Sequence, residues 1–189
     1  MADHTFDPAT TVVTDIKGDY TLDPTHSRLG FSTRHAMVTT VRGQFKDFTG
    51  EAVIDTADPA ASKVDVTIKA ASVDTGVADR DGHLQSADFF DVATYPEITF
   101  VSTDVTRDGS DWTITGDLTI KDVTKPITID FELTGSAKDP FGNTRLGFEG
   151  KAVLNRKDWG LTWNAALETG GLLVSDKIKL DFDISAIAK

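Results

Sequence analysis

The side chains best suited to acid–base or metal chemistry are three histidines that follow the N-terminal lead-in (residues 1–18): His26, His35 and His83. Zinc sites typically show close spacings such as His-x-His or His-Glu-x-x-His, and neither occurs in this sequence. His35 follows Phe31 at an even spacing, which is typical of one side of a β-strand. We therefore interpret His35 as a polar residue on the inner face or at the mouth of a barrel. We predict neither a metal site nor a cofactor.

The sequence also lacks the motifs that accompany covalent or phosphoryl chemistry. It contains no cysteine, no Gly-x-Ser-x-Gly elbow and no Walker-type phosphate loop. Asp79 and Asp81 could act as an acid and a base, but 30 acidic residues in 189 produce such pairs by chance. We predict no catalytic residue and a protein that is not an enzyme. The alternative is a hydrolase or isomerase that uses His35 or His83 with Asp81 on an apolar substrate.

Charge and hydropathy restrict the possible partners. The 30 acidic and 19 basic residues give a net charge of −11, which argues against nucleic acid or an anionic membrane surface as the main partner. No run of apolar residues exceeds three, as at 172–174, whereas a membrane-spanning helix needs about 20. We therefore predict that the chain is not an integral membrane protein. The start of the chain does not resemble a secretion signal, so we expect a cytoplasmic location.

Short runs of alternating apolar and polar residues dominate the chain. Between Lys177 and Ile184 the even positions are apolar and the odd positions are charged. Similar runs span residues 64–70, 112–120, 127–133 and 146–154. Turn-forming residues separate them, for example at 108–109 and 140–143. Many one-sided strands with few helical patterns predict an all-β protein, either an antiparallel sandwich or a barrel.

One polar stretch interrupts the strands. Residues 76–95 contain a histidine and two adjacent phenylalanines, and they predict a long connection with one or two helical turns. Long ordered connections in compact β proteins more often carry function than not. The length suits a single domain, which we place at residues 19–189 after the lead-in at 1–18.

Small residues on the apolar sides of strands indicate an interior with room for a ligand. Gly116, Gly150 and Ala152 occupy positions where a sandwich core would carry large side chains. In a closed barrel, such residues leave a cavity that could hold a lipid-like tail. The alternative for each single glycine is a bulge or a bend in its strand.

Four basic or imidazole side chains could form a polar mouth to such a cavity: Arg34, His35, Arg80 and His83. The planar fork of arginine suits an anionic head group because it donates two parallel hydrogen bonds. For Arg80, a salt bridge to a neighbouring aspartate in the same loop is an equally good interpretation.

Several motifs occur in one order along nearly the whole chain. The segments are Tyr20–Ser27, Val73–Gly76, Arg80–Leu84, Asp88–Val92, Tyr95–Phe100, Gly116–Ile120 and Asn155–Gly160. Together they resemble the YceI-like family over roughly residues 18 to 189. The resemblance implies a lipocalin-like antiparallel β-barrel with a hydrophobic pore and a short helical connection around residues 76–95. It also implies binding of polyisoprenoids or other long amphiphiles, and a possible homodimer. Many members carry a secretion signal and work in the periplasm, whereas none is evident here.

From these observations we predict a protein that carries, stores or shields a long amphiphilic lipid, such as a polyisoprenoid or an isoprenoid quinone. The residues that we expect to contact this ligand are Phe31, Arg34, His35, Arg80, His83, Phe89, Phe100, Ile114, Leu118, Phe131, Phe148, Trp159, Leu161 and Trp163. Besides the enzyme alternative, a purely structural barrel whose pore is filled by large side chains is a third possibility.

Overall fold

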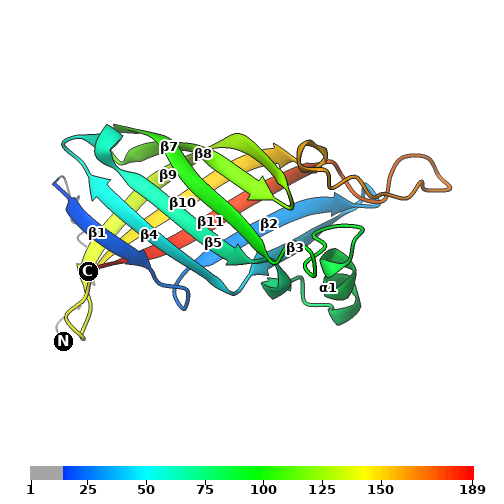
Figure 1. Cartoon of the computed structure of the whole chain (residues 1–189), viewed down its shortest axis with the longest axis horizontal. Coiled ribbons are helices and arrows are strands. Elements are labelled where there is room, and N and C mark those ends of the chain that lie inside the picture. Colours follow the sequence, from blue (N-terminus) through cyan, green and yellow to red (C-terminus); the bar gives the residue numbers. More distant parts are fainter. Residues whose placement is uncertain (1–14) are drawn as a thin grey trace, which may run out of the picture.

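The structure is a computed structural model, and it describes residues 15–189. Within this part of the chain the backbone forms one antiparallel sheet and a short α-helix, α1 (Ala78–Gln85) (Figure 1). The strands are β1 (Lys17–Leu22), β2 (Arg28–His35), β3 (Thr39–Phe45), β4 (Phe48–Asp55), β5 (Lys63–Lys69), β6 (Val73–Asp74), β7 (Glu97–Asp108), β8 (Asp111–Ile120), β9 (Val123–Lys138), β10 (Thr144–Asn155) and β11 (Lys177–Ala188). In the same residues, no helix is long and apolar enough to cross a membrane.

The sheet closes on itself through its last strand. The strand order is β1-β4-β5-β7-β8-β9-β10-β11, and β1 pairs with β11, so a ring of eight strands forms within residues 15–189. This closure rules out a sandwich and confirms the predicted single antiparallel barrel with a short helical connection. The first strand begins at Lys17, two residues before the expected domain boundary. The first fourteen positions of the predicted lead-in lie outside the described residues.

One edge of β11 is divided between two partner strands. Ala186–Ala188 pair with β1, whereas Lys179–Asp183 pair with β2. Beyond β2, the strands β3 and β6 extend the sheet. The β2–β3 hairpin therefore continues past the closed ring, and it projects at the end of the molecule where α1 lies (Figure 1).

The alternation of residue types explains why these segments are strands with one inner face. In β4, Phe48, Gly50, Ala52 and Ile54 are buried, and the residues between them are exposed. Alternate side chains of a strand point to opposite faces of the sheet, so one face of β4 lies inside the barrel. This arrangement keeps apolar side chains inside without any long apolar run in the sequence.

The buried side chains form two main clusters. One contains Ile98, Leu118 and Trp159 and packs against Phe90, which follows α1. The other lies beside β1 and contains Tyr20, Trp112 and Leu146, together with further residues of β4, β7 and β11. In Figure 1, α1 and β1 lie toward opposite ends of the long axis, so the two clusters lie toward opposite ends of the barrel.

A buried ion-pair network fixes the turn that follows β1. Asp23 is only 8% exposed, and its Oδ2 accepts a hydrogen bond of 2.7 Å from Nη1 of Arg145 in β10. Nδ1 of His26 lies 2.8 Å from the same carboxylate, and Nε of Arg145 also donates to Asp139 at 2.8 Å. Burial acts to raise the pKa of Asp23. The hydrogen bonds from Arg145, Thr25 and His26 outweigh burial and hold this pKa well below its usual range.

We predict that Asp23→Asn lowers the unfolding free energy at neutral pH by about 2 kcal/mol, because it removes the buried member of the two carboxylates that pair with the partly buried Arg145 guanidinium. A depressed native pKa stabilises the fold above the unfolded-state pKa of about 4, and this stabilisation is lost as the pH falls further. The variant should therefore lose stability less steeply on acidification, as measured by urea unfolding between pH 7 and pH 3.

Asp181→Asn is the matched control, because Asp181 forms a long 3.5 Å contact with Arg28 in which both side chains are exposed. We expect a change of less than about 0.5 kcal/mol for it. Equal effects of the two substitutions would contradict the role assigned to Asp23.

Candidate functional site

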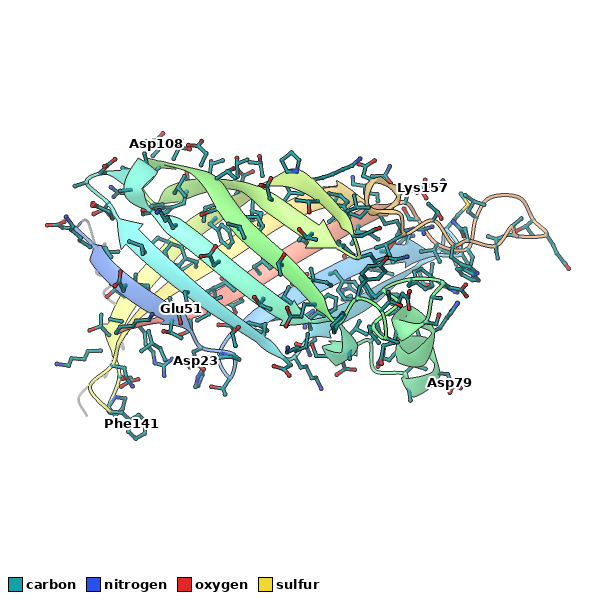
Figure 2. The ribbon with its side chains drawn as sticks, in the orientation of Figure 1. Asp23, Glu51, Asp79, Asp108, Phe141 and Lys157 are labelled. Atoms are coloured by element: carbon teal, nitrogen blue, oxygen red, sulfur yellow. The ribbon has the colours of Figure 1, made fainter. Side chains whose placement is uncertain are left out.

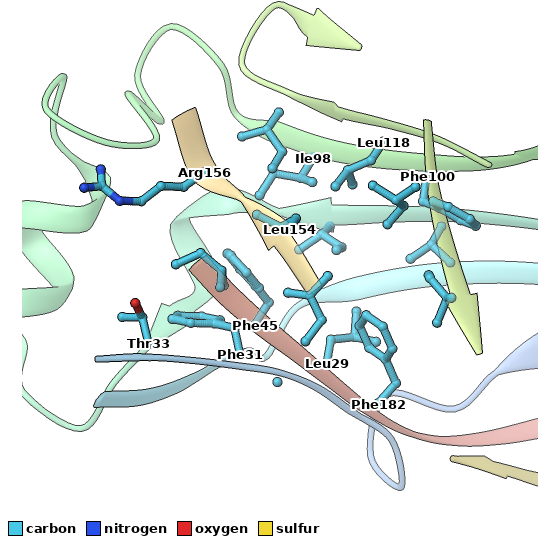
Figure 3. A pocket seen from close by; sticks show the side chains of 18 of the residues that line it. Leu29, Phe31, Thr33, Phe45, Ile98, Phe100, Leu118, Leu154, Arg156 and Phe182 are labelled. Carbon is cyan, nitrogen blue, oxygen red and sulfur yellow. The ribbon is translucent and has the colours of Figure 1, made fainter. Parts of the chain in front are cut away.

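The inner faces of the strands enclose a cavity of about 570 Å³ (Figure 3). This volume is typical of sites for small molecules, which range from about 300 to 1,000 Å³. Apolar side chains from most strands line the cavity, and Figure 3 shows Leu29, Phe31, Phe45, Ile98, Phe100, Leu118, Leu154 and Phe182 pointing into one region of it. The barrel is therefore hollow, which argues against the third possibility of a pore filled by large side chains.

The charged residues that line the cavity come from one end of the barrel, which we call the mouth. They are Arg34 at the end of β2, Asp79 and Arg80 in α1, and Arg156 just after β10. His35 pairs with Val174, which joins β2 to the segment 161–176 and brings these elements together. The lining is thus polar at the mouth and apolar along the rest of the wall.

Thr75 anchors the start of α1. Oδ1 of Asp81 accepts hydrogen bonds from the backbone N–H and the hydroxyl of Thr75, at 2.8 and 2.6 Å. Arg80 donates from Nε to the Thr75 hydroxyl and from Nη2 to its carbonyl oxygen, both at 2.7 Å. The expected alternative, a salt bridge from Arg80 to a neighbouring aspartate, does not form among the described residues. The guanidinium lines the mouth instead.

An aromatic cluster joins the α1 connection to the segment 161–176. The ring of His83 lies edge-on to Trp163, with centroids 4.6 Å apart, and edge-on to Phe89 at 5.1 Å. Nε2 of His83 lies 2.9 Å from Oδ2 of Asp88. His83 therefore does not pair with Asp81, and the acid–base pair of the enzyme alternative is not assembled at this residue. Nor do the described residues contain three His, Asp or Glu side chains close enough to hold a metal ion.

Arg156 is a buried residue of the site that the sequence analysis missed. It is 2% exposed, and it donates to the carbonyl oxygens of Leu161 at 2.5 Å, Trp163 at 2.9 Å and Ser175 at 3.0 Å. Burial lowers its pKa, although nearby Asp176 favours the charged form. The guanidinium thus ties the two ends of the segment 161–176 to the barrel. The sequence feature that could have revealed this residue is its position, since it is an arginine directly after the alternating run at residues 146–154.

Glycines on the inner wall accommodate aromatic rings from neighbouring strands. A Cβ atom at Gly43 would collide with the ring of Phe31, and one at Gly150 would collide with the ring of Phe131. Both phenylalanines pair directly with their glycines across the sheet. Gly116 accommodates the ring of Phe100 in the same way, although the two residues are diagonal neighbours and not a direct pair.

This arrangement corrects the expectation that the glycines themselves leave open space. Rings fill the positions above Gly116 and Gly150, because a residue without a Cβ leaves room for a ring of the next strand against the backbone. The glycines therefore accommodate the phenylalanines of the wall and do not themselves leave open space.

The structure places most of the predicted contact residues along the cavity. Those that line it are Phe31, Arg34, His35, Arg80, His83, Phe89, Phe100, Ile114, Leu118, Phe131, Phe148, Leu161 and Trp163. Trp159 is the exception, because it does not line the cavity. It is 3% exposed, packs in the cluster around Ile98 and Leu118, and donates from Nε1 to the Leu118 carbonyl at 2.9 Å.

Trp112 lines the cavity within the cluster beside β1. It is 3% exposed and packs edge-on to Phe148, with centroids 6.3 Å apart. Its Nε1 donor has no acceptor among residues 15–189. Sequence alternation placed Trp112 on an inner face but gave no sign of this unpaired donor.

The closed antiparallel barrel, with its apolar cavity and polar mouth, defines a lipocalin-like barrel protein. Residues 20–186 match the profile of the YceI-like domain, and the chain belongs to this family. Protein YceI of Escherichia coli O157:H7 is 45% identical over 148 residues, which cover 77% of this chain and 78% of that protein.

Solved structures show the same architecture. The YceI protein of Campylobacter jejuni is 35% identical, with a TM-score of 0.71 over 82% of this chain and 90% of that one. A polyisoprenoid-binding domain from Saccharophagus degradans is 18% identical, with a TM-score of 0.67 over 90% of this chain and 98% of that one, and shows the fold alone.

We predict that Gly150→Ala forces the Phe131 ring away from the wall. Crowding a packed interior costs about 1–3 kcal/mol, and the displaced ring should narrow the cavity. Urea unfolding and titration with the fluorescent fatty acid parinaric acid measure both effects. Gly135→Ala is the control, because a Cβ atom there meets no atom within 4 Å. Unchanged stability and probe binding in Gly150→Ala would contradict the wall arrangement.

We predict that Arg156→Met loosens the segment 161–176, because three buried or partly buried carbonyl groups lose their donor. Amide hydrogen exchange in this segment should become at least about tenfold faster, which corresponds to about 1.4 kcal/mol of lost protection. Lys157→Met is the control, since the Lys157 side chain is 46% exposed. Equal exchange rates in the two variants would show that Arg156 does not hold the segment.

Proposed function

We propose that this protein binds a long amphiphilic lipid, such as a polyisoprenoid or an isoprenoid quinone, with the tail in the cavity and the head at the mouth. The observation that carries the proposal is the separation of polarity within one cavity, whose wall is apolar and whose charged lining residues lie at the mouth. Membership of the YceI-like family and the fold shared with a polyisoprenoid-binding domain support it.

Apolar burial supplies the affinity in this proposal. Each methylene group moved from water into an apolar environment contributes about 0.8 kcal/mol, so a long tail can offset the cost of immobilising the ligand. A cavity that exists before the ligand arrives keeps the cost of reorganising the protein low. Phe31, Phe100 and Phe131, which lie against glycines of the wall and line the cavity, supply apolar contact for such a tail.

The mouth favours a polar or anionic head group. Three arginines line it, Arg34, Arg80 and Arg156, against one acidic residue of the lining, Asp79. The guanidinium of Arg34 also donates to Thr40 and to the carbonyl oxygens of Met37 and Val38. Arg80 donates to Thr75 through Nε and Nη2, while Nη1 has no acceptor among residues 15–189 and is available for a ligand oxygen. Arg156 is committed to backbone carbonyls and pairs with Asp176 at 3.6 Å, so Arg80 is the main candidate for contact with the head group.

A binding protein fits the mouth better than an enzyme. The enzyme alternative pairs Asp81 with His35 or His83, and neither histidine hydrogen-bonds to Asp81 among residues 15–189. Asp81 holds Thr75, and His83 contacts Asp88 and packs against Trp163. The family and its polyisoprenoid-binding fold neighbour support a binding function as well. The cytoplasmic location and the homodimer stay predictions.

Native mass spectrometry of the protein purified from a bacterial host, together with lipid extraction, tests the proposal. We expect a bound amphiphile near one per chain, or uptake of an added isoprenoid quinone. Leu180→Trp, which fills the cavity, should reduce uptake at least about tenfold, because one large buried side chain corresponds to about 1.5–3 kcal/mol of apolar contact.

Val153→Trp is the matched control. Val153 lies in the neighbouring strand, pairs with Lys179 and is 59% exposed on the outer wall. No bound amphiphile together with no quinone uptake, or uptake that Leu180→Trp leaves unchanged, would overturn the proposal. Conversion of the added lipid, abolished by His83→Ala, would instead favour the enzyme alternative.

A further inference from the structure

The turn between β2 and β3 presents large apolar side chains to solvent. Met37 is 64% exposed and Val38 is 72% exposed. Turn positions usually carry glycine, asparagine, aspartate or serine, which suit both the backbone and the solvent. Packing within the described part of the chain does not explain apolar residues at the tip of this hairpin.

The backbone of this turn is held in a costly conformation. Ala36 and Met37 have φ angles of 49° and 64°, in the left-handed region that favours glycine. Arg34 maintains the turn by donating from Nη2 to the carbonyl oxygens of Met37 at 3.4 Å and Val38 at 3.1 Å. The tip is therefore preformed, and its apolar side chains point outward at the expense of stability.

A third exposed apolar residue lies beside the turn. Leu172 is 44% exposed, and the adjacent Gly171 lies against the Met37 side chain. The backbone N–H of Ala36 donates to the Leu173 carbonyl at 2.7 Å. We call Met37, Val38 and Leu172 the apolar tip. Figure 1 shows the hairpin and the segment 161–176 projecting together from the α1 end of the barrel.

The apolar tip is continuous with the mouth of the cavity. Leu173 and Val174 follow Leu172 directly and line the cavity. His35, which precedes the turn, lines it as well and pairs with Val174. A surface that meets the tip would therefore face the opening through which a ligand enters.

The hairpin that carries the tip has a positive formal charge, whereas the protein as a whole is negatively charged. Residues 24–46 contain no aspartate or glutamate, although the chain as a whole has 30. The same residues include Arg28, Arg34, Arg42 and Lys46. Arg28 contacts Asp181 and Lys46 pairs with Asp74, whereas Arg34 and Arg42, nearer the turn, have no ion-pair partner among residues 15–189. The net charge of −11 therefore belongs to other surfaces, and this hairpin is locally basic. A basic flank beside an apolar tip complements the anionic head groups and the acyl region of a bilayer.

We propose that the apolar tip and its basic flank dock the mouth of the barrel on an anionic lipid bilayer. The inference rests on the proposed function, because the bilayer is the source or destination of the lipid in the cavity. The tip enters the boundary between head groups and acyl chains, while Arg34 and Arg42, the two arginines nearest the turn, contact lipid phosphates. A narrow, preformed apolar projection suits insertion between lipids, whereas a protein partner would require a broader complementary surface.

Flotation with vesicles tests this proposal. We expect binding to vesicles of phosphatidylcholine with 30% phosphatidylglycerol, and weaker binding to phosphatidylcholine alone or in 0.5 M salt. The double variant Met37→Asp and Val38→Asp should reduce binding at least about tenfold, because two apolar side chains lose their burial and two negative charges are added.

The matched control is the double variant Phe141→Asp and Val153→Asp, which adds the same charge elsewhere. Phe141 is 90% exposed in the β9–β10 turn, away from the mouth in Figure 2, and Val153 is 59% exposed on the outer wall. We expect this variant to bind vesicles like the unaltered protein. Equal loss in both double variants, or no binding by the unaltered protein, would overturn the docking proposal.

Two further measurements separate this proposal from its alternatives. The tip variant should still take up an isoprenoid quinone supplied in detergent, so loss of vesicle binding with intact uptake supports docking specifically. If the unaltered protein takes up no quinone but floats with vesicles through the tip, the proposed function fails while docking stands. Light scattering that shows a dimer abolished by the tip variant, with vesicle binding unchanged, would identify the tip as an interface between copies and overturn the proposal.

Discussion

The interior of this barrel depends on cross-strand pairs in which a phenylalanine ring lies over a glycine. At Gly43, Gly116 and Gly150, a Cβ atom would collide with the ring that occupies the position. Protein interiors are close-packed, so a barrel of ordinary apolar side chains fills its own lumen. By seating rings against glycines of the wall, the chain combines aromatic apolar surface with a cavity of about 570 Å³. The stability of the wall and the capacity of the site are therefore linked.

The second determinant of the site is the divided edge of β11. The pairing with β1 closes the ring, and the pairing with β2 carries the hairpin beyond it. The same strand thus both seals the barrel and positions the hairpin that borders the mouth. Arg156 completes this end, because its guanidinium binds carbonyl oxygens from both ends of the segment 161–176. The charged residues of the cavity lining all belong to elements at the mouth, whereas the rest of the strands supply the apolar wall.

The sequence predicted the features that depend on local pattern. Alternation of apolar and polar residues predicted the strands and their inner faces, so inward-facing residues such as Ile114 and Phe148 were correctly placed on the cavity wall. The role of the glycines could not be predicted, because it depends on which residue of the next strand lies opposite. The burial of Trp159 and the contacts of Arg156 likewise depend on long-range register and on the path of an irregular segment. Neither the register between distant strands nor the path of an irregular segment can be read from a single sequence.

The most direct measurement of the central claim is a crystal structure of the protein loaded with an isoprenoid quinone. The account predicts continuous density for the tail inside the barrel, along the wall formed by Phe31, Phe100 and Phe131, with the quinone ring at the mouth near Arg34 and Arg80. Quinone density on the outer surface only, with the phenylalanine rings rotated off their glycines to fill the interior, would contradict it.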